Sequence, residues 1–154
     1  MLGHLSGVEI EVIVRLVVAV LLGALFGLER SLAGKHAGMR TYALVSLGSA
    51  LFTVVGVVAS YQLASFVGIN PLQIAGSVVI GIGFIGAGLA VYKSEHPVEL
   101  TTASGIWVAA AIGMTAGLGY FGVAFAATVL GILVFSLLLR LENKLRRSYG
   151  TEAE

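Results

Sequence analysis

Five long apolar stretches dominate this chain of 154 residues. They cover residues 12–28, 42–63, 72–92, 100–118 and 121–139. Each is close to the ~20 residues that a helix needs to cross a hydrocarbon layer ~30 Å thick. Because lipid offers no partner for backbone polar groups, such stretches cross it as helices. The sequence therefore predicts an all-α fold, a polytopic bundle of five transmembrane helices within one domain over 1–154, ending in a polar tail over 140–154.

The composition supports a lipid environment. Hydrophobic residues make up 58% of the chain and charged residues 11%, whereas about 25% of a soluble domain is charged. The chain has no Cys, which excludes disulfides and thiolate metal sites, and it has no Asp. A signal peptide begins with basic residues, yet Glu9 and Glu11 precede the first apolar stretch. We therefore expect the first stretch to be a retained helix.

Basic residues occupy alternate gaps between the apolar stretches. The first gap holds Arg30, Lys35 and Arg40, and the third holds Lys93. The tail holds Arg140, Lys144, Arg146 and Arg147. Lys and Arg stay on the cytoplasmic side of a bilayer, so we expect the N-terminus outside and the C-terminus inside. Aromatic residues suited to the headgroup region mark the predicted span ends: Tyr42, Tyr61, Tyr92 and Tyr120.

Small residues along the predicted helices indicate where helices pack. In the first span, Ala19, Gly23 and Gly27 recur at intervals of four, and spans three and four are richer still. Small faces let helices approach closely in lipid, where no hydrophobic force drives association. The predicted helix-packing positions are Gly23, Gly27, Gly81, Gly83, Gly86, Gly88, Gly105 and Gly113. We infer that spans three and four pack centrally, while much of the leucine-rich span five faces lipid.

Residues 81–86 match the dinucleotide-binding pattern G-x-G-x-x-G. That pattern binds a cofactor only where a strand turns into a helix, with an acidic residue about 20 residues further on. Here it lies inside an apolar span, so no cofactor is expected. Two interpretations are open: the glycines pack against another helix, or they break the helix and expose carbonyl groups to a cavity.

A polar cluster is expected at the inner ends of spans one, two and four. Its members are Glu29, Arg30, Arg40, Thr41, Thr101 and Thr102. A Glu29–Arg40 ion pair would satisfy both groups and join the first two spans. The alternative is a vestibule for an ion or a partner. Mg²⁺ requires six well-placed oxygens, and one carboxylate beside a guanidinium is a poor site, so no metal ligands are predicted.

A second polar cluster is expected at the outer surface, and it contains Glu11, Arg15, Asn70 and Gln73. Arg15 is the one Lys or Arg inside a predicted span. Its side chain can reach the outer surface and pair with Glu11, four residues earlier. The alternative is contact with Asn70 and Gln73. No nucleophile–base pair stands in helical register anywhere in the chain, so no catalytic residue is predicted and the protein is not expected to be an enzyme.

Several motifs resemble the MgtC/SapB family of membrane proteins in order and spacing, over residues 12–135. They are Gly23-Ala-Leu-Phe-Gly27-Leu-Glu29-Arg30, Ala37-Gly38-Met39-Arg40-Thr41, Gly81-Ile-Gly-Phe-Ile-Gly86-Ala-Gly88, Leu100-Thr-Thr-Ala103 with Trp107, and Ala110-Ala-Ile-Gly113. The resemblance implies a multi-pass bacterial inner-membrane protein of four or five helices. It also implies a link to growth under magnesium limitation, virulence in some pathogens, and restraint of the F-type ATP synthase.

The sequence departs from that family at two places. Larger members continue into a soluble C-terminal domain, whereas this sequence ends about 15 residues after its last predicted span. Roles that depend on that domain are therefore not expected. The family also often has Asp-x-x-Arg before the glycine-rich helix, where this chain has Asn70-Pro-Leu-Gln73. An outer ion site built on that Asp is not expected either.

Two functions stand as hypotheses. The first is a small non-enzymatic membrane protein, linked by resemblance to magnesium homeostasis, that associates through its helices. Its partner would be a second copy, as a homodimer in the lipid bilayer, or a larger membrane complex such as the F-type ATP synthase; no nucleic-acid partner is expected. The alternative is a transporter or channel for an ion or small solute, suggested by a stripe of small and hydroxyl residues in span two: Ser46, Ser49, Thr53, Gly56 and Ser60.

Overall fold

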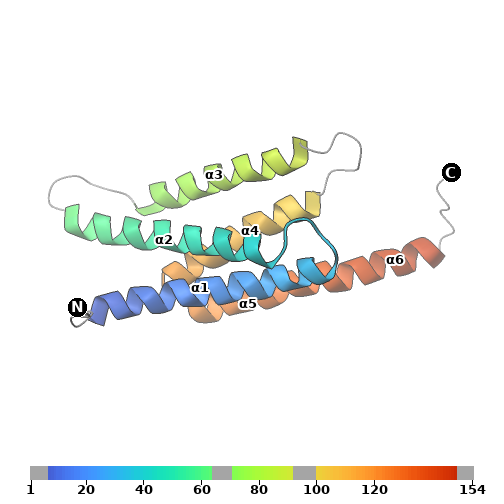
Figure 1. Ribbon diagram of the computed structural model, residues 1–154, viewed down its shortest axis with the longest axis horizontal. Coiled ribbons are helices and arrows are strands. Elements are labelled where there is room, and N and C mark those ends of the chain that lie inside the picture. Colours follow the sequence, from blue (N-terminus) through green and yellow to red (C-terminus); the bar gives the residue numbers. More distant parts are fainter. Residues whose placement is uncertain (1–6, 64–70, 92–99, 149–154) are drawn as a thin grey trace.

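The chain forms a bundle of helices in the computed structural model, which describes residues 7–63, 71–91 and 100–148. These ranges contain no strand, and the predicted all-α fold is confirmed. The elements are α1 (Gly7–Leu32), α2 (Met39–Leu63), α3 (Pro71–Val91), α4 (Leu100–Gly117), α5 (Phe121–Leu133), the π-helical segment η1 (Val134–Leu138) and α6 (Leu139–Ser148). The segments α5, η1 and α6 follow one another as a single long rod (Figure 1).

Four helical stretches are long and apolar enough to cross a membrane. They are Gly7–Leu32, Met39–Tyr61, Leu100–Gly117 and Phe121–Leu145. A shorter apolar helix, Gln73–Leu89, forms most of α3. The prediction of a multi-pass helical membrane protein is therefore confirmed. The count of five spans and the outside–inside orientation stay predictions.

Glycine ends two of the helices in the same way. Gly34 follows α1 with φ 68°, and Gly119 follows α4 with φ 86°. After α4, the N–H of Gly119 donates to the carbonyl of Ala116 at 2.9 Å, and the N–H of Tyr120 donates to that of Thr115 at 3.1 Å. This pair of bonds satisfies the last carbonyls of a helix and requires the left-handed conformation that glycine adopts without strain. Both turns reverse the chain tightly, so α1 lies against α2 and α4 lies against α5.

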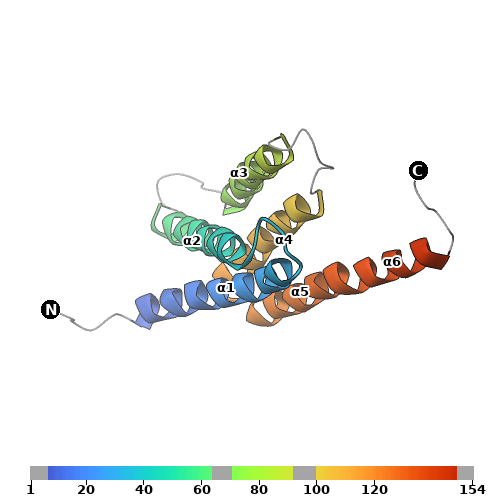
Figure 2. The same ribbon diagram turned by 45° about the vertical axis from the view of Figure 1, so that its right-hand side comes forward.

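The helix α4 lies at the centre of the bundle. Half of its span is buried, compared with 28% for the spans of α1 and α2 and 11% for Phe121–Leu145. The central place of span four and the lipid-facing character of span five agree with the predictions. In Figures 1 and 2, α1, α2, α4 and α5 form the body of the bundle, and α3 lies on its outside, along α2 and α4.

The predicted central place of span three is wrong. Most of the described side chains of α3 are exposed, and Ile82 is its one buried residue. A methyl group added at Gly81, Gly83 or Gly88 would have no neighbour within 4 Å in the described part of the chain. Gly86 has an ordinary contact with Ala103 of α4, at 3.7 Å. The reason is that α1, α2 and α4 already fill the centre through their own small residues.

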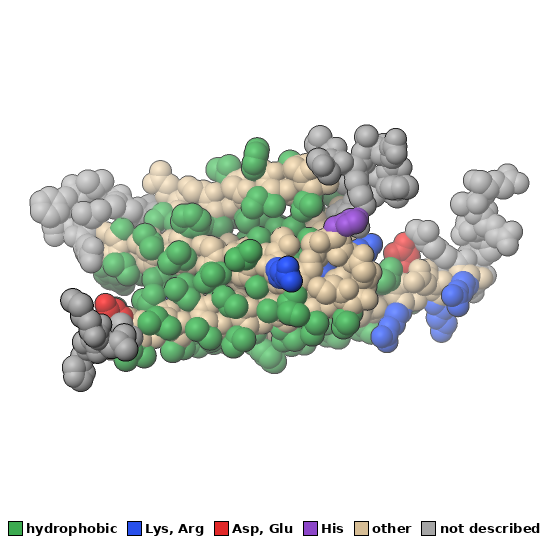
Figure 3. Space-filling model, in the orientation of Figure 1, with side chains coloured by type: hydrophobic (Ala, Val, Ile, Leu, Met, Phe, Trp, Pro, Cys, Tyr) green, Lys and Arg blue, Asp and Glu red, His purple; other side chains and the backbone are tan. Residues whose placement is uncertain are grey.

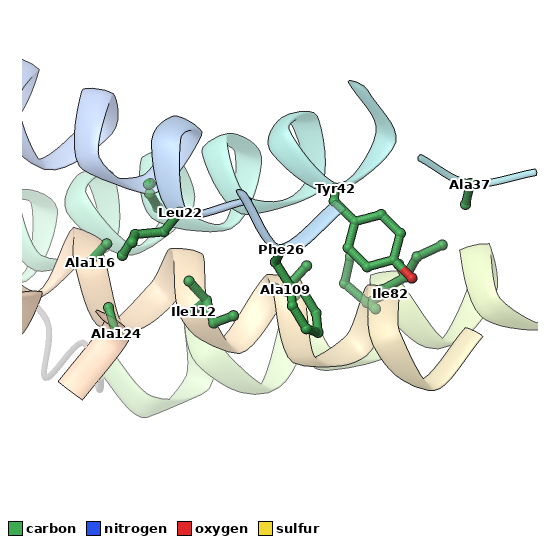
Figure 4. Close-up of a cluster of buried hydrophobic side chains, with 13 residues drawn as sticks. Leu22, Phe26, Ala37, Tyr42, Ile82, Ala109, Ile112, Ala116 and Ala124 are labelled. Atoms are coloured by element: carbon green, nitrogen blue, oxygen red, sulfur yellow. The ribbon is translucent and has the colours of Figure 1, made fainter. Parts of the chain in front are cut away.

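Bulky apolar side chains fill the space between the central helices (Figure 4). Phe26, Tyr42, Ile106 and Ile112 are almost fully enclosed. Tyr42 is 0% exposed, although its place at the start of a span suggested the headgroup region. Tyr61 and Tyr120 are exposed as that reasoning expected, and Tyr92 lies outside the described residues. Trp107 of α4 is about half exposed, on the outside of the bundle.

Candidate functional site

The closest helix crossing of the bundle is centred on Ser46 of α2, which lies between α1 and α4. The Ser46 hydroxyl donates a hydrogen bond of 2.7 Å to the carbonyl of Ala19 in α1. A methyl group added at Gly23 of α1 would lie 2.6 Å from Ser46 Cβ, and one at Gly113 of α4 would overlap the Ser46 backbone. Both glycines are therefore required for α1 and α4 to approach α2 from two sides.

Two more of the predicted packing glycines also make close contacts. A methyl group at Gly27 would lie 2.8 Å from Met39 Cα, and one at Gly105 would meet the Tyr42 hydroxyl and the Phe135 ring. The structure thus places Gly23, Gly27, Gly105 and Gly113 at helix crossings. It leaves Gly81, Gly83 and Gly88 without such a crossing and gives Gly86 a looser one.

The hydroxyl stripe of α2 serves mainly the packing of the helix. Ser46 and Thr53 are buried, and Thr53 donates to the carbonyl of Ser49 at 2.8 Å. Ser60 donates to the carbonyl of Val57 at 2.8 Å. Ser49 is buried as well. The stripe therefore does not form a continuous line of free hydroxyl groups.

A buried guanidinium marks one end of the bundle, which we call the basic end because the α1–α2 connection and α6 lie there. Arg30 is 3% exposed, and its Nε donates to the carboxylate of Glu29. The guanidinium carbon lies 3.7 Å from the centre of the Phe135 ring, a cation–π contact. Arg30 lies on the buried face of α1, three residues after Gly27. The charge is therefore held by one carboxylate and one aromatic face.

The Phe135 ring that contacts this guanidinium belongs to an aromatic cluster. Phe135 stacks on Phe26 with ring centroids 5.2 Å apart, and Phe26 meets Tyr42 edge to face at 5.4 Å. The Tyr42 hydroxyl donates to the carbonyl of Thr102 at 3.3 Å. One cluster thus joins α1, α2, α4 and η1. Sequence reasoning missed Tyr42 and Phe135, because their partners lie far away along the chain.

The inner polar cluster is brought together only in part. Glu29, Arg30 and Thr102 lie in or beside the aromatic cluster, whereas Arg40 and Thr101 are exposed and Thr41 is half-buried. The expected Glu29–Arg40 ion pair is absent from the described residues, where Glu29 pairs with Arg30 instead. The reason is that Arg30 faces the bundle from α1, while Arg40, in the first turn of α2, points away from it.

At the opposite end of the bundle, Arg15 joins α1 to the end of α4. Its Nη1 donates to the carbonyl of Gly117 at 3.0 Å, and its Nη2 pairs with Glu11 as the spacing predicted. A cation is favourable there because the last carbonyls of a helix carry partial negative charge. Gln73 is exposed at the start of α3, and Asn70 lies outside the described residues. The structure therefore supports the pairing with Glu11, and Gly117 is a partner that sequence reasoning missed.

An open groove of about 510 Å³ lies between α2 and α3. Its walls are almost entirely apolar, and its small and polar positions are Gly48, Ser49, Ser77 and Gly81. The described residues contain no group of three His, Asp or Glu side chains that could hold a metal ion. His36 lies in the α1–α2 connection, and His4 and His96 are outside the described ranges.

Known proteins similar to this chain share its membrane region. A profile of the MgtC family matches residues 16–144. The protein named "Putative magnesium transporter YhiD" of Escherichia coli (strain K12) is 42% identical over 87% of this chain and 65% of its own length. Protein SapB of Bacillus subtilis (strain 168) is 35% identical over 78% of this chain and 53% of its own. Protein MgtC of Salmonella typhimurium (strain LT2) is 41% identical over 83% of this chain and 52% of its own.

The chain thus spans about half to two thirds of the length of these relatives. No solved structure matches it significantly. The family profile covers most of the chain, and it agrees with the motifs around Glu29, Arg40 and Gly81 and with the apolar helices of the structure. This multi-pass protein of the bacterial inner membrane belongs to the MgtC family.

Proposed function

We propose that this chain is a non-enzymatic, magnesium-related membrane protein that acts by binding other transmembrane helices through the outer face of α3. That face consists of Gly76, Ile80, Gly83, Phe84 and Ala87. The relation to magnesium is supported by the name of YhiD, at 42% identity. The mode of action is supported by one observation above all: in the helix richest in glycine, Gly76, Gly81, Gly83 and Gly88 have no close neighbour within the described chain.

Inside the bundle, small residues serve as contact points between helices. Gly23 and Gly113 let two helices approach Ser46, and the Ser46 hydroxyl then bonds to a backbone carbonyl across the crossing. The outer face of α3 has glycines of the same kind, beside the protruding side chains of Ile80 and Phe84, which are 77% and 83% exposed. Protruding side chains beside a row of glycines form a surface against which another helix can pack closely.

The groove beside this face adds a polar anchor. Ser49 of α2 is 3% exposed and lines the groove. A helix carbonyl can accept a hydrogen bond from a serine hydroxyl on such a surface, as the carbonyl of Ala19 does from Ser46. The groove and the outer face of α3 together would receive a helix of a second copy or of a larger membrane complex.

Single cysteines test this proposal directly, because the chain has none of its own. With Ile80→Cys in native membranes, a short thiol cross-linker should give a defined adduct, since Ile80 lies on the outer face of α3. The matched control is Leu130→Cys on α5, which is 62% exposed and lies outside the proposed face. We expect at least about threefold less adduct from Leu130, and the adduct mass shows whether the partner is a second copy or another protein.

The bulky replacement Gly83→Leu in the Ile80→Cys chain should reduce the adduct severalfold, because it fills the close-approach position. It should leave the monomer folded, since no atom of the described residues lies within 4 Å of a methyl group at that position. Equal adduct yields from Ile80→Cys and Leu130→Cys, or a yield unchanged by Gly83→Leu, would mean that the cross-links come from random collisions in the membrane. Either result would contradict the proposal.

Transport of Mg²⁺ is a second candidate, favoured by the name of YhiD. We expect vesicles that contain only the purified protein to take up no more Mg²⁺ than empty vesicles, because most hydroxyls of the α2 stripe already bond to backbone carbonyls. A fluorescent Mg²⁺ indicator inside the vesicles measures this. Uptake that depends on the protein and is lost in Glu29→Gln would favour transport over helix association.

A further inference from the structure

The helix α6 extends away from the bundle at the basic end (Figures 1 and 2). Every side chain that the structure describes in α6 is exposed. It contains Arg140, Lys144 and Arg147, and Figure 3 shows Lys and Arg side chains gathered at this end of the molecule. The helix α6 directly continues α5 and η1 and contains the end of the candidate span Phe121–Leu145.

The two faces of α6 differ sharply. Leu141 and Leu145 are spaced four residues apart and therefore share one face, with 51% and 46% of their surfaces exposed. The cations Arg140, Lys144 and Arg147 are spaced by four and three residues and share another. Helices with one apolar and one basic face bind in the plane of a membrane surface, with the apolar face among the acyl chains.

We propose that α6 lies along the membrane surface and binds anionic phospholipid headgroups through Arg140, Lys144 and Arg147. The charges are complementary, because phosphate groups accept hydrogen bonds from guanidinium and ammonium groups, and basic residues near a span are attracted to anionic leaflets. Leu141 and Leu145 then enter the lipid beneath them. This inference concerns a different surface from the outer face of α3 and does not depend on it.

In the structure α5, η1 and α6 form one rod (Figure 1), so this placement requires the rod to bend at the π-helical segment η1 (Val134–Leu138). Extra residues of this kind within an α-helix are places where the helix axis kinks. If the rod stayed straight along the membrane normal, as one Phe121–Leu145 span, Leu145 would lie about 9 Å beyond Leu139 along that normal, at 1.5 Å per residue. A turn at η1 keeps both leucines in lipid and places the cations beside phosphate groups.

Fluorescent labels on single cysteines can measure the depth of each face. We compare Leu141→Cys with Asn143→Cys, on nearly opposite sides of α6, in vesicles of phosphatidylcholine with one third phosphatidylglycerol. A quencher attached to lipid acyl chains should quench the label at position 141 about threefold more than the label at position 143. Acrylamide, a quencher dissolved in the water, should quench the label at position 143 more than the label at position 141.

Two controls connect this difference to charge. In vesicles of phosphatidylcholine alone, the ratio of acyl-chain quenching at position 141 to that at position 143 should fall towards one. The triple variant Arg140→Gln, Lys144→Gln and Arg147→Gln should lower it equally in the anionic vesicles, whereas Arg40→Gln, an exposed cation outside α6, should leave it unchanged.

Equal quenching of both labels in every vesicle would show that α6 stands in water and would overturn the proposal. A difference that is independent of lipid charge, or that grows with protein density in the vesicles, would also overturn it. Such a result would assign the apolar face of α6 to a protein contact instead.

Discussion

Replacement of Gly113 by alanine is expected to destabilise the bundle by about 2–3 kcal/mol, in the upper part of the range of about 1–3 kcal/mol that is usual for a side chain forced into a filled interior. The added methyl group would overlap the backbone of Ser46, and backbone cannot move aside as a flexible side chain can. Relief requires α4 to withdraw from α2 or Ser46 to shift, and a shift of Ser46 would also weaken its hydrogen bond to Ala19 of α1. Thermal unfolding in detergent micelles, followed by circular dichroism, measures the loss.

Gly83→Ala is the matched control for this substitution. Gly83 is also a glycine inside an apolar helix, but a methyl group there has no neighbour within 4 Å in the described structure. Alanine is favoured over glycine inside helices by up to about 1 kcal/mol, so this variant should be as stable as the parent or slightly more so. Equal loss in both variants would mean that glycine itself, rather than the crossing at Ser46, determines stability.

The sequence predicts that Gly23 and Gly27 pack closely against another helix, without identifying that helix, because the signal is local. Ala19, Gly23 and Gly27 recur every four residues, which places them on one face of a helix whatever the partner is. In lipid, such a face has few uses other than close packing. The helical fold, the helix-terminating glycines and the lipid exposure of α5 follow from similarly local features.

The misplacement of α3 has a different cause. Its glycines predict that another helix can approach closely, but glycine content does not identify which helix that is. In α1 and α4 the partner is α2 of the same chain, whereas Gly81 and Gly83 have no counterpart in the described residues. Packing competition decides the outcome: once α1 and α4 contact α2 on two sides, α3 can only lie outside.

The ionic contacts could be predicted only where they are local. Arg15 with Glu11 follows from a spacing of four on one helix, and the structure contains it. The partners of Arg30 do not follow from spacing, because the ring of Phe135 reaches it from η1. One sequence signal did exist: Arg30 continues the buried face of Gly23 and Gly27, which should have directed it inward and away from Arg40.

Removal of the Arg30 side chain is expected to produce the largest loss of stability, about 3 kcal/mol. In Arg30→Ala, Glu29 keeps its charge in a mostly buried position and loses its partner, because the Arg30 and Glu29 side chains are 4% and 18% exposed. The contact between the guanidinium and Phe135 is lost together with the packing of the arginine stem. Thermal and chemical unfolding in the same micelles measures the difference from the parent.

A second substitution separates the unpaired charge from the lost packing. Glu29→Gln combined with Arg30→Met removes both charges and keeps similar volume, and replacing a buried pair by neutral groups is often nearly neutral. We therefore expect the double variant to recover at least half of the loss. Arg40→Met, which removes an exposed cation, should change stability by less than about 0.5 kcal/mol. If the double variant were no better than Arg30→Ala, the aromatic contact rather than the ion pair would hold the basic end together.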